Sequence, residues 1–226
     1  MKRAFSFLLL IFFLLTSCNP SMPMNTGATL RVQHTAAAAP FLADLSACAD
    51  QAGVMLQPDL RLAAAFDLTG ADLALRLGDP GVTSPAYQIG ADEILVIVNR
   101  QNPAGPLSAD DVRGLFSGRI QNWKEINGSD APVQVWVFPS GEDVQQAFVI
   151  AALDGGPVTP AARLAMTPDE MSQAVASDVN AVGILTRRWK AGNVTDVYTA
   201  ASVPALILVP SEMADGAAAF IACAQK

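Results

Sequence analysis

The strongest constraint on the fold of this 226-residue chain is the alternation of short apolar runs with helix-like segments. The clearest run, 94–98, has five consecutive apolar and mostly β-branched residues, which is typical of a buried strand. Further strands are predicted at 29–33, 54–57, 72–77, 133–138, 181–185, 194–198 and 205–209. Helices are predicted at 40–51, 109–117, 144–153, 168–176 and 211–224. Strands that alternate with helices indicate an α/β fold with a mainly parallel sheet.

The segment 107–123 carries its own helix start and stop signals. Ser108 is a favourable N-cap, and Asp110 and Asp111 fall in the first turn, where carboxylates interact well with the helix dipole. Apolar residues at 112, 115 and 116 give one i, i+3, i+4 face. Gly118 marks the end, and the chain then leads through Trp123 towards a turn. We therefore expect a short amphipathic helix here.

Residues 1–17 have the pattern of an export signal. Lys2 and Arg3 precede an apolar run at 5–15, which is too short to span a bilayer in a mature protein. The residues 15–18 are similar to a bacterial lipobox, in which the signal is cut before the cysteine and that thiol carries a diacylglycerol. An ordinary secretory signal with a chance Cys18 is the alternative. Residues 18–27 predict a flexible tether. We expect a lipid-anchored protein of the cell envelope, on the extracytoplasmic face of a membrane.

The charge and residue inventory exclude several classes of function. Loss of Lys2 and Arg3 moves the formal charge from −7 to −9, with 12 basic against 21 acidic residues, and no basic stripe points to nucleic acid. A single histidine, His34, and the lack of a nucleophile elbow leave nucleophilic catalysis without its usual groups. Neither a metal-ligand spacing nor a nucleotide fingerprint occurs. The sequence therefore predicts a protein that is not an enzyme and binds no metal or cofactor.

Two cysteines remain once Cys18 is assigned to lipid. Cys48 lies in the first predicted helix and Cys223 in the last. An exported compartment permits disulfides, so the two thiols either form a bridge or stay free and buried.

Several stretches resemble phosphate-binding proteins of ABC importers. The phrase 107–123 is similar to that family's leucine-serine … phenylalanine-serine-glycine … asparagine-tryptophan signature. The strand 91–99 with Asn102-Pro103, and the stretch 181–184, also resemble family segments. The resemblance implies a type II periplasmic binding protein fold: two α/β lobes, two crossover strands and a ligand cleft between the lobes. Lobe one would comprise 28–98 plus 199–226, and lobe two 99–198. The first and last helices, with Cys48 and Cys223, would then share a lobe.

The same resemblance implies a site for an anion where strand–loop–helix segments present backbone N–H groups to the cleft. Thr35 would contribute a hydroxyl, Asp72 would accept a proton from a protonated phosphate, and Arg76 would supply positive charge. Ser140 and Gly141 correspond to the family's serine-glycine, but Glu142 stands where a threonine is expected, and the preceding arginine is missing. The candidate ligand-binding residues are His34, Thr35, Ala36, Asp72, Arg76, Ser140, Gly141 and Glu142.

Two functions follow from these patterns. The first is a monomeric, lipid-anchored solute-binding protein that captures a small anion, phosphate first, and delivers it to an ABC permease by closure of its lobes. The second is a degenerate envelope sensor or interaction module without a role in transport, which the loss of loop hydroxyls and the short chain favour. Glu142 and Asp143 would repel a dianion in a desolvated cleft, so either they point away or the ligand is not phosphate. The basic run 187–190 is either a contact for a partner or for lipid head groups, or a solvated helix end.

Overall fold

The computed structural model describes residues 27–79, 81 and 84–226. The predicted export signal, Cys18 and all of the predicted tether except Gly27 lie outside these residues. An eight-stranded sheet with the strand order β2-β1-β3-β8-β4-β7-β5-β6 forms the centre of the molecule. Its strands are β1 (Thr29–His34), β2 (Met55–Leu60), β3 (Leu73–Leu77), β4 (Ala86–Asn99), β5 (Gln134–Val137), β6 (Arg163–Leu164), β7 (Ala181–Thr186) and β8 (Val194–Leu208).

Five α-helices cover the sheet: α1 (Ala39–Ala52), α2 (Ala109–Ser117), α3 (Asp143–Leu153), α4 (Pro168–Ser177) and α5 (Ala217–Ala224). The described residues also include three short 3₁₀ turns in the connections between elements: η1 (Ala63–Ala65), η2 (Trp123–Ile126) and η3 (Arg187–Trp189). Within the described part of the chain, none of these helices combines the length and apolar character needed to cross a membrane.

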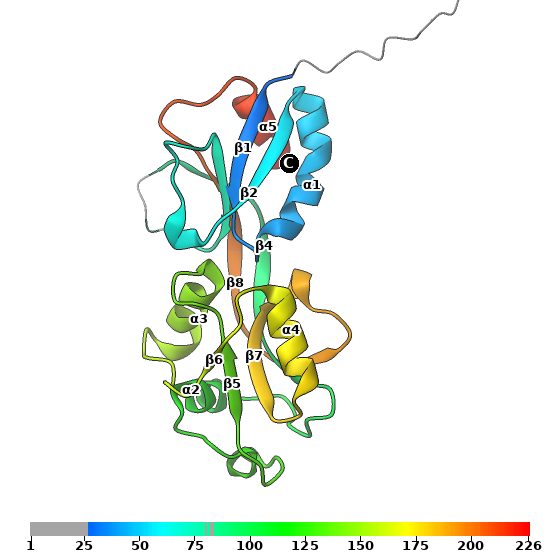
Figure 1. Cartoon of the computed structure of the whole chain (residues 1–226), viewed down its shortest axis with the longest axis vertical. Coiled ribbons are helices and arrows are strands. Elements are labelled where there is room, and N and C mark those ends of the chain that lie inside the picture. The colour runs from blue at the N-terminus through cyan, green and yellow to red at the C-terminus, as the bar shows by residue number, and fades with distance from the viewer. Residues whose placement is uncertain (1–26, 80, 82–83) are drawn as a thin grey trace, which may run out of the picture.

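The molecule is elongated and has two lobes (Figure 1). The terminal lobe contains β1, β2, β3, α1 and α5, and the middle lobe contains α2, α3, α4, β5, β6 and β7. The long strands β4 and β8 run antiparallel through both lobes. Gly90 of β4 pairs with Ala205 of β8 in the terminal lobe, whereas Ile94 pairs with Thr186 of β7 in the middle lobe. The passage between the lobes therefore lies between Gly90 and Ile94 on β4.

The lobe ranges inferred from the sequence, 28–98 plus 199–226 against 99–198, stay a prediction, and the strand pairs favour a division a few residues earlier on β4.

The sheet is mixed rather than mainly parallel. Its flanks are parallel, but the pairs β3–β8, β8–β4 and β4–β7 are antiparallel, because the two crossing strands run in opposite directions. The separate strands expected at 194–198 and 205–209 are one strand, since the residues between them continue the ladder with β4.

The helix α2 forms as its sequence signals indicate. The Ser108 hydroxyl accepts from the backbone N–H of Asp111, and the Asp111 carboxylate accepts in return from the N–H of Ser108 at 2.9 Å. Gly118 ends the helix with a φ of 78°, and a Cβ there would lie 2.6 Å from Thr159 Oγ1. Glycine is therefore required at this stop by both conformation and space.

The closing helix is shorter than the predicted 211–224. It begins only after Gly216, whose φ of 80° is left-handed and interrupts any helix through that position. A Cβ on Gly216 would lie 2.5 Å from Val54 Cγ1, so the chain passes close to the end of α1 here.

A disulfide joins the first and last helices of the terminal lobe. Cys48 of α1 and Cys223 of α5 are bonded, with their Cα atoms 5.5 Å apart. Of the two alternatives left open by the sequence, the structure therefore has the bridge. It links residues 175 positions apart and ties the C-terminus to α1.

Candidate functional site

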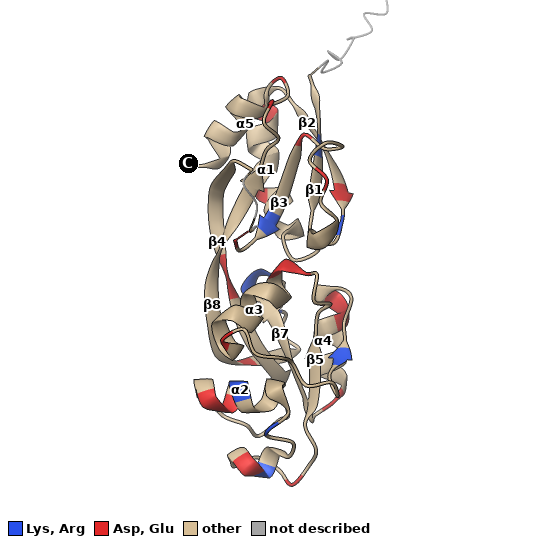
Figure 2. Ribbon diagram, turned by 90° about the vertical axis from the view of Figure 1, so that its left-hand side faces the viewer, with Lys and Arg blue, Asp and Glu red and all other residues tan. Residues whose placement is uncertain are grey.

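The junction of the two lobes brings together the ends of strands and the starts of helices. β1 and β3 are parallel neighbours, so Thr35 and Leu77 lie at the same edge of the terminal lobe's sheet. The loop after β1 leads into α1, and the loop after β5 leads into α3 from the opposite lobe. Figure 2 shows the acidic start of α3 at the level where the lobes meet. A helix start presents unpaired N–H groups and the positive end of the dipole, which suits an anion.

The carboxylate of Asp143 occupies this junction. Its Oδ2 accepts hydrogen bonds from Thr35 Oγ1 at 2.8 Å and from the backbone N–H of Leu77 at 2.8 Å. Its Oδ1 accepts from the N–H of Val144 at 2.8 Å. Thr35 Oγ1 accepts in turn from the N–H of Ala38 at 3.3 Å. The terminal lobe thus holds a carboxylate of the middle lobe, and we call its two donors, the Thr35 hydroxyl and the Leu77 N–H, the cradle.

Burial controls the charges around the cradle. Asp143 is only 1% exposed, and burial raises the pKa of its carboxyl, although the hydrogen bonds from Leu77 and Thr35 act in the opposite direction. Burial, followed by the nearby Asp143 charge, raises the pKa of Glu142 to about 7. Burial also lowers the pKa of Arg76, opposed by the charges of Asp143, Asp79 and Glu142. The junction is therefore a desolvated cluster of two adjacent carboxyls and one guanidinium.

Little free space remains on the side of the cradle that faces Ala36 and Phe138. A cavity of about 10 Å³ is lined by residues of both lobes, among them Ala36, Ala37, Glu142 and Asp143. This volume admits one water at most. Any larger ligand of the cradle requires the lobes to separate and the Asp143 carboxylate to leave.

Most of the predicted loop residues lie at this junction. Thr35, Ala36 and Glu142 meet there, and Arg76 lies on the adjoining strand, one residue before Leu77. Gly141 accepts a hydrogen bond across the lobes, from the N–H of Ala64 at 3.2 Å.

Three predicted residues have other surroundings. His34 is buried, and its Nδ1 donates to the carbonyl of Thr35 at 3.0 Å. Ser140 is exposed and lines a separate apolar groove beside α3. Asp72 does not join the cluster, because it lies just before β3 begins, where its carboxylate accepts from the N–H of Arg31 at 2.7 Å. The C-terminal ends of the parallel strands form the junction, so a residue at the start of β3 lies away from it.

Asp143 is not among the ligand-binding residues predicted from the sequence. The available signal was an acidic residue in the first turn of a helix that follows a strand, which is usually only a dipole contact. Its partner Thr35 is 108 positions away in the chain, so local patterns carry no information about the contact.

A second set of contacts joins the lobes at the side of α1. Arg188 Nη1 lies 2.6 Å from Asp44 Oδ2, and the Arg188 guanidinium lies 4.0 Å from the centre of the Phe41 ring. Trp189 Nε1 donates to the carbonyl of Ala37 at 3.1 Å. These residues of η3 thus hold the N-terminal half of α1.

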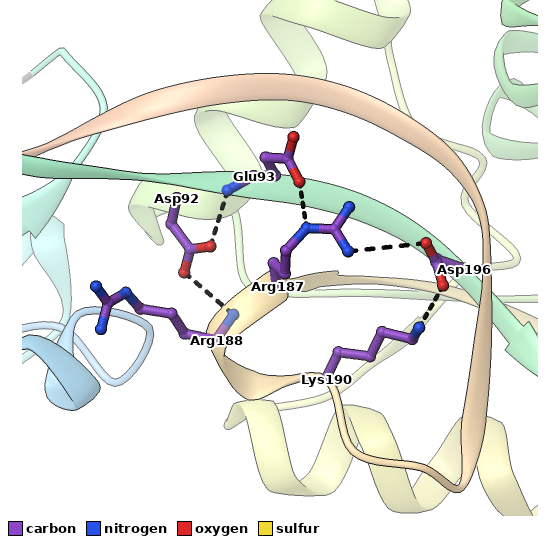
Figure 3. A network of polar contacts seen from close by, with 6 residues as sticks. All are labelled: Asp92, Glu93, Arg187, Arg188, Lys190 and Asp196. Carbon is purple, nitrogen blue, oxygen red and sulfur yellow. Dashed lines mark hydrogen bonds and ion pairs between the residues drawn. The ribbon is translucent and has the colours of Figure 1, made fainter.

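The basic run 187–190 belongs to this set rather than to a solvated helix end. Arg187 pairs with Glu93 and lies 4.0 Å from Asp196, which also pairs with Lys190 (Figure 3). The N–H of Arg188 donates to Asp92. The run is therefore engaged with β4 and β8, close to the passage between the lobes.

Among the residues that the structure describes, no group of three or more histidine, cysteine, aspartate or glutamate side chains could hold a metal ion. At the junction, the hydroxyl of Thr35 and the N–H of Leu77 donate to the carboxyl of Asp143.

Comparison with known proteins yields one family match and several similar proteins. The model of the PBP superfamily domain matches residues 83–221. The phosphate-binding protein PstS of Bacillus subtilis is 30% identical over 69 residues, which span 30% of this chain and only 23% of that protein.

Solved structures are similar over nearly the whole fold. A Clostridium perfringens protein assigned as a phosphate ABC transporter substrate-binding protein, with phosphate bound, is 18% identical with a TM-score of 0.77, over 86% of this chain and 91% of that one. An ABC-type phosphate transport receptor from Vibrio cholerae is 18% identical with a TM-score of 0.66, over 85% and 93%. A variant OxyR2 regulatory domain from Vibrio vulnificus is 14% identical with a TM-score of 0.64, over 88% and 95%.

Proposed function

Because this chain belongs to the PBP superfamily, we propose that it captures a small anion between its lobes, inorganic phosphate first, and delivers it to an ABC permease. The type II periplasmic binding protein fold, with two lobes joined by two crossing strands, provides the closing motion that such capture requires. The phosphate-binding relatives in Clostridium perfringens and Bacillus subtilis support phosphate as the first candidate.

The observation that carries the proposal is the way the cradle holds Asp143. A hydroxyl and a backbone N–H of one lobe converge on a carboxylate oxygen of the other, each at 2.8 Å. The same donors suit an oxygen of a bound oxyanion, because charge-assisted hydrogen bonds of this kind need only an anionic acceptor. In the closed protein Asp143 stands in for the ligand.

Capture then proceeds by exchange. When the lobes separate, the Asp143 carboxylate leaves Thr35 and Leu77 and becomes solvated. An incoming anion accepts from these two donors in place of the carboxylate. The contacts of Arg188 with Asp44 and Phe41 form again as the lobes close around the ligand.

Competition between Asp143 and phosphate gives the first test. Asp143→Asn keeps the shape of the side chain but removes a negative charge from a desolvated site. We expect this variant to bind phosphate about 10-fold more tightly, since about 1.4 kcal/mol of repulsion suffices for that change. Isothermal calorimetry with phosphate, sulfate and nitrate measures it.

A matched control is Asp110→Asn, the same change in the first turn of α2, on an exposed side chain outside the junction. It should leave the affinity for phosphate unchanged. If neither the wild-type protein nor Asp143→Asn binds any of the three oxyanions, capture of a small oxyanion is excluded.

We propose that Cys18 anchors the protein to the outer side of a membrane through a diacylglycerol. Mass spectrometry of the membrane-extracted protein should find that lipid on Cys18 as the first residue. Cys18→Ser should move the protein into the soluble fraction. A mature chain that starts at another residue would exclude the anchor.

A second candidate function is an envelope sensor. Two observations favour it: the Asp143 carboxylate already fills the cradle, and the similar Vibrio vulnificus structure is a regulatory domain. The calorimetric test separates the two candidate functions. A role in phosphate transport requires that the protein bind phosphate, whereas a role as an envelope sensor does not.

A further inference from the structure

A second and larger cavity opens beside the cradle, on the side of η1. It has a volume of about 430 Å³, within the range of pockets that enclose small organic ligands. Phe66, Leu68 and Leu208 form apolar parts of its lining. Arg76 of β3 and Gln146 of α3 contribute polar groups, so both lobes take part in the cavity.

Arg76 is unusual among the charged residues. Its side chain lines the cavity, yet the residue is only 6% exposed. Within the described part of the chain its guanidinium forms no ion pair within 4.0 Å, and its buried Nε has no hydrogen-bond partner. A buried charge without a direct hydrogen-bonded partner destabilises the folded protein. A ligand that pairs with the guanidinium would explain why Arg76 is buried without such a partner.

We propose that this cavity binds a small organic acid through one carboxylate, which takes the planar fork of the Arg76 guanidinium. Two parallel N–H···O bonds between a guanidinium and a carboxylate are both strong and geometrically specific. The hydrocarbon body of the acid lies against Phe66 and Leu68. The amide of Gln146 offers a further polar contact from the middle lobe.

The charges that surround Arg76 favour a single negative charge on the ligand. Asp143, Asp79 and Glu142 all act on Arg76, and Asp67 lies at the exposed rim. The first carboxylate of the ligand pairs directly with the guanidinium, whereas a second negative charge would face these carboxyls without a cationic partner in the lining. The site goes beyond the capture of phosphate proposed above, because it is open while Asp143 still fills the cradle.

Benzoate, with benzamide as its uncharged counterpart, is the probe for this site. Calorimetry should show binding of benzoate and at least 10-fold weaker binding of benzamide to the wild-type protein. In Arg76→Met, benzoate binding should fall at least 10-fold. The ligand-free variant should melt roughly 2–8 °C higher than the wild type, because an unpaired buried charge has been replaced by an apolar side chain of similar length.

A second variant leaves Arg76 in place. Gln146→Glu adds a carboxylate of the same shape to the lining and should weaken benzoate binding several-fold. Gln173→Glu, the same change on the exposed face of α4, is the control and should have no effect.

Failure of this site and failure of phosphate capture give different results. The organic-acid site is overturned if benzoate does not bind the wild type, or if it binds Arg76→Met equally well. This holds whether or not phosphate binds. Benzoate that depends on Arg76 supports the site even if phosphate does not bind. An effect of Gln173→Glu equal to that of Gln146→Glu would also count against it.

Discussion

Replacing Cys48 and Cys223 together by serine should lower the free energy of unfolding by about 2–5 kcal/mol. The bridge closes a loop between residues 175 positions apart, so its removal gives the unfolded chain much more conformational freedom. It also fixes α5, a short helix of eight residues at the end of the chain, onto α1. Urea unfolding of the wild type and the double variant measures the difference.

The wild-type protein in the presence of reductant is the control and should match the double variant. The single variant Cys48→Ser should be destabilised nearly as much as the double variant, because one serine already prevents the bridge. A double variant that unfolds at the wild-type urea concentration would show that the bridge contributes nothing to stability.

The second large effect is on the pH dependence of stability. The pKa of Glu142 is about 7 in the folded protein, against an ordinary value of 4.5. Between these two values the folded state binds more protons than the unfolded state. The contribution of Glu142 to stability is therefore present below pH 4.5 and is lost as the pH rises through 7. The slope is at most about 1.4 kcal/mol per pH unit, and the total is on the order of 3 kcal/mol.

Urea unfolding at pH 5, 6, 7 and 8 detects this effect as a difference between two proteins. Glu142→Gln keeps the side chain's shape, cannot ionise, and should make stability less dependent on pH between 5 and 7. Glu212→Gln, an exposed residue outside the junction, is the control and should follow the wild type. Parallel curves for Glu142→Gln and the wild type would contradict the assignment.

The fold was largely predictable because its signals are local or belong to a recognisable pattern. The α/β class and the type II periplasmic binding protein fold are confirmed. The helix α2 follows from Ser108, Asp111 and Gly118, which act on neighbours only a few positions away. The full length of β4 and β8 was not predictable. Polar residues such as Asp92 and Glu93 interrupt the apolar pattern, and only pairing between distant segments makes these strands continuous.

The site was predictable only in outline. Thr35 was inferred from the resemblance of its loop, after a strand and before a helix, to the family's first loop, and its role in binding a ligand stays a prediction. The contact with Asp143 depends on how the two lobes close, and no local pattern contains that information. The same is true of Arg188, whose partners Asp44 and Phe41 lie on a helix of the other lobe.

The path of the two crossing strands has a consequence for the order in which the protein folds. The elements of the middle lobe from α2 to β7 follow one another along the chain, between the crossing strands β4 and β8. The terminal lobe is discontinuous, because β3 pairs with Ala205–Leu208, which follow the middle lobe in the chain. During synthesis, which proceeds from the N-terminus, the middle lobe can therefore fold first. The strands β1, β2 and β3 lack their partner until the end of β8 has been synthesised. The terminal lobe is therefore completed after the middle lobe. Its last step is the packing of α5, which brings Cys223 to Cys48 so that the bridge can form.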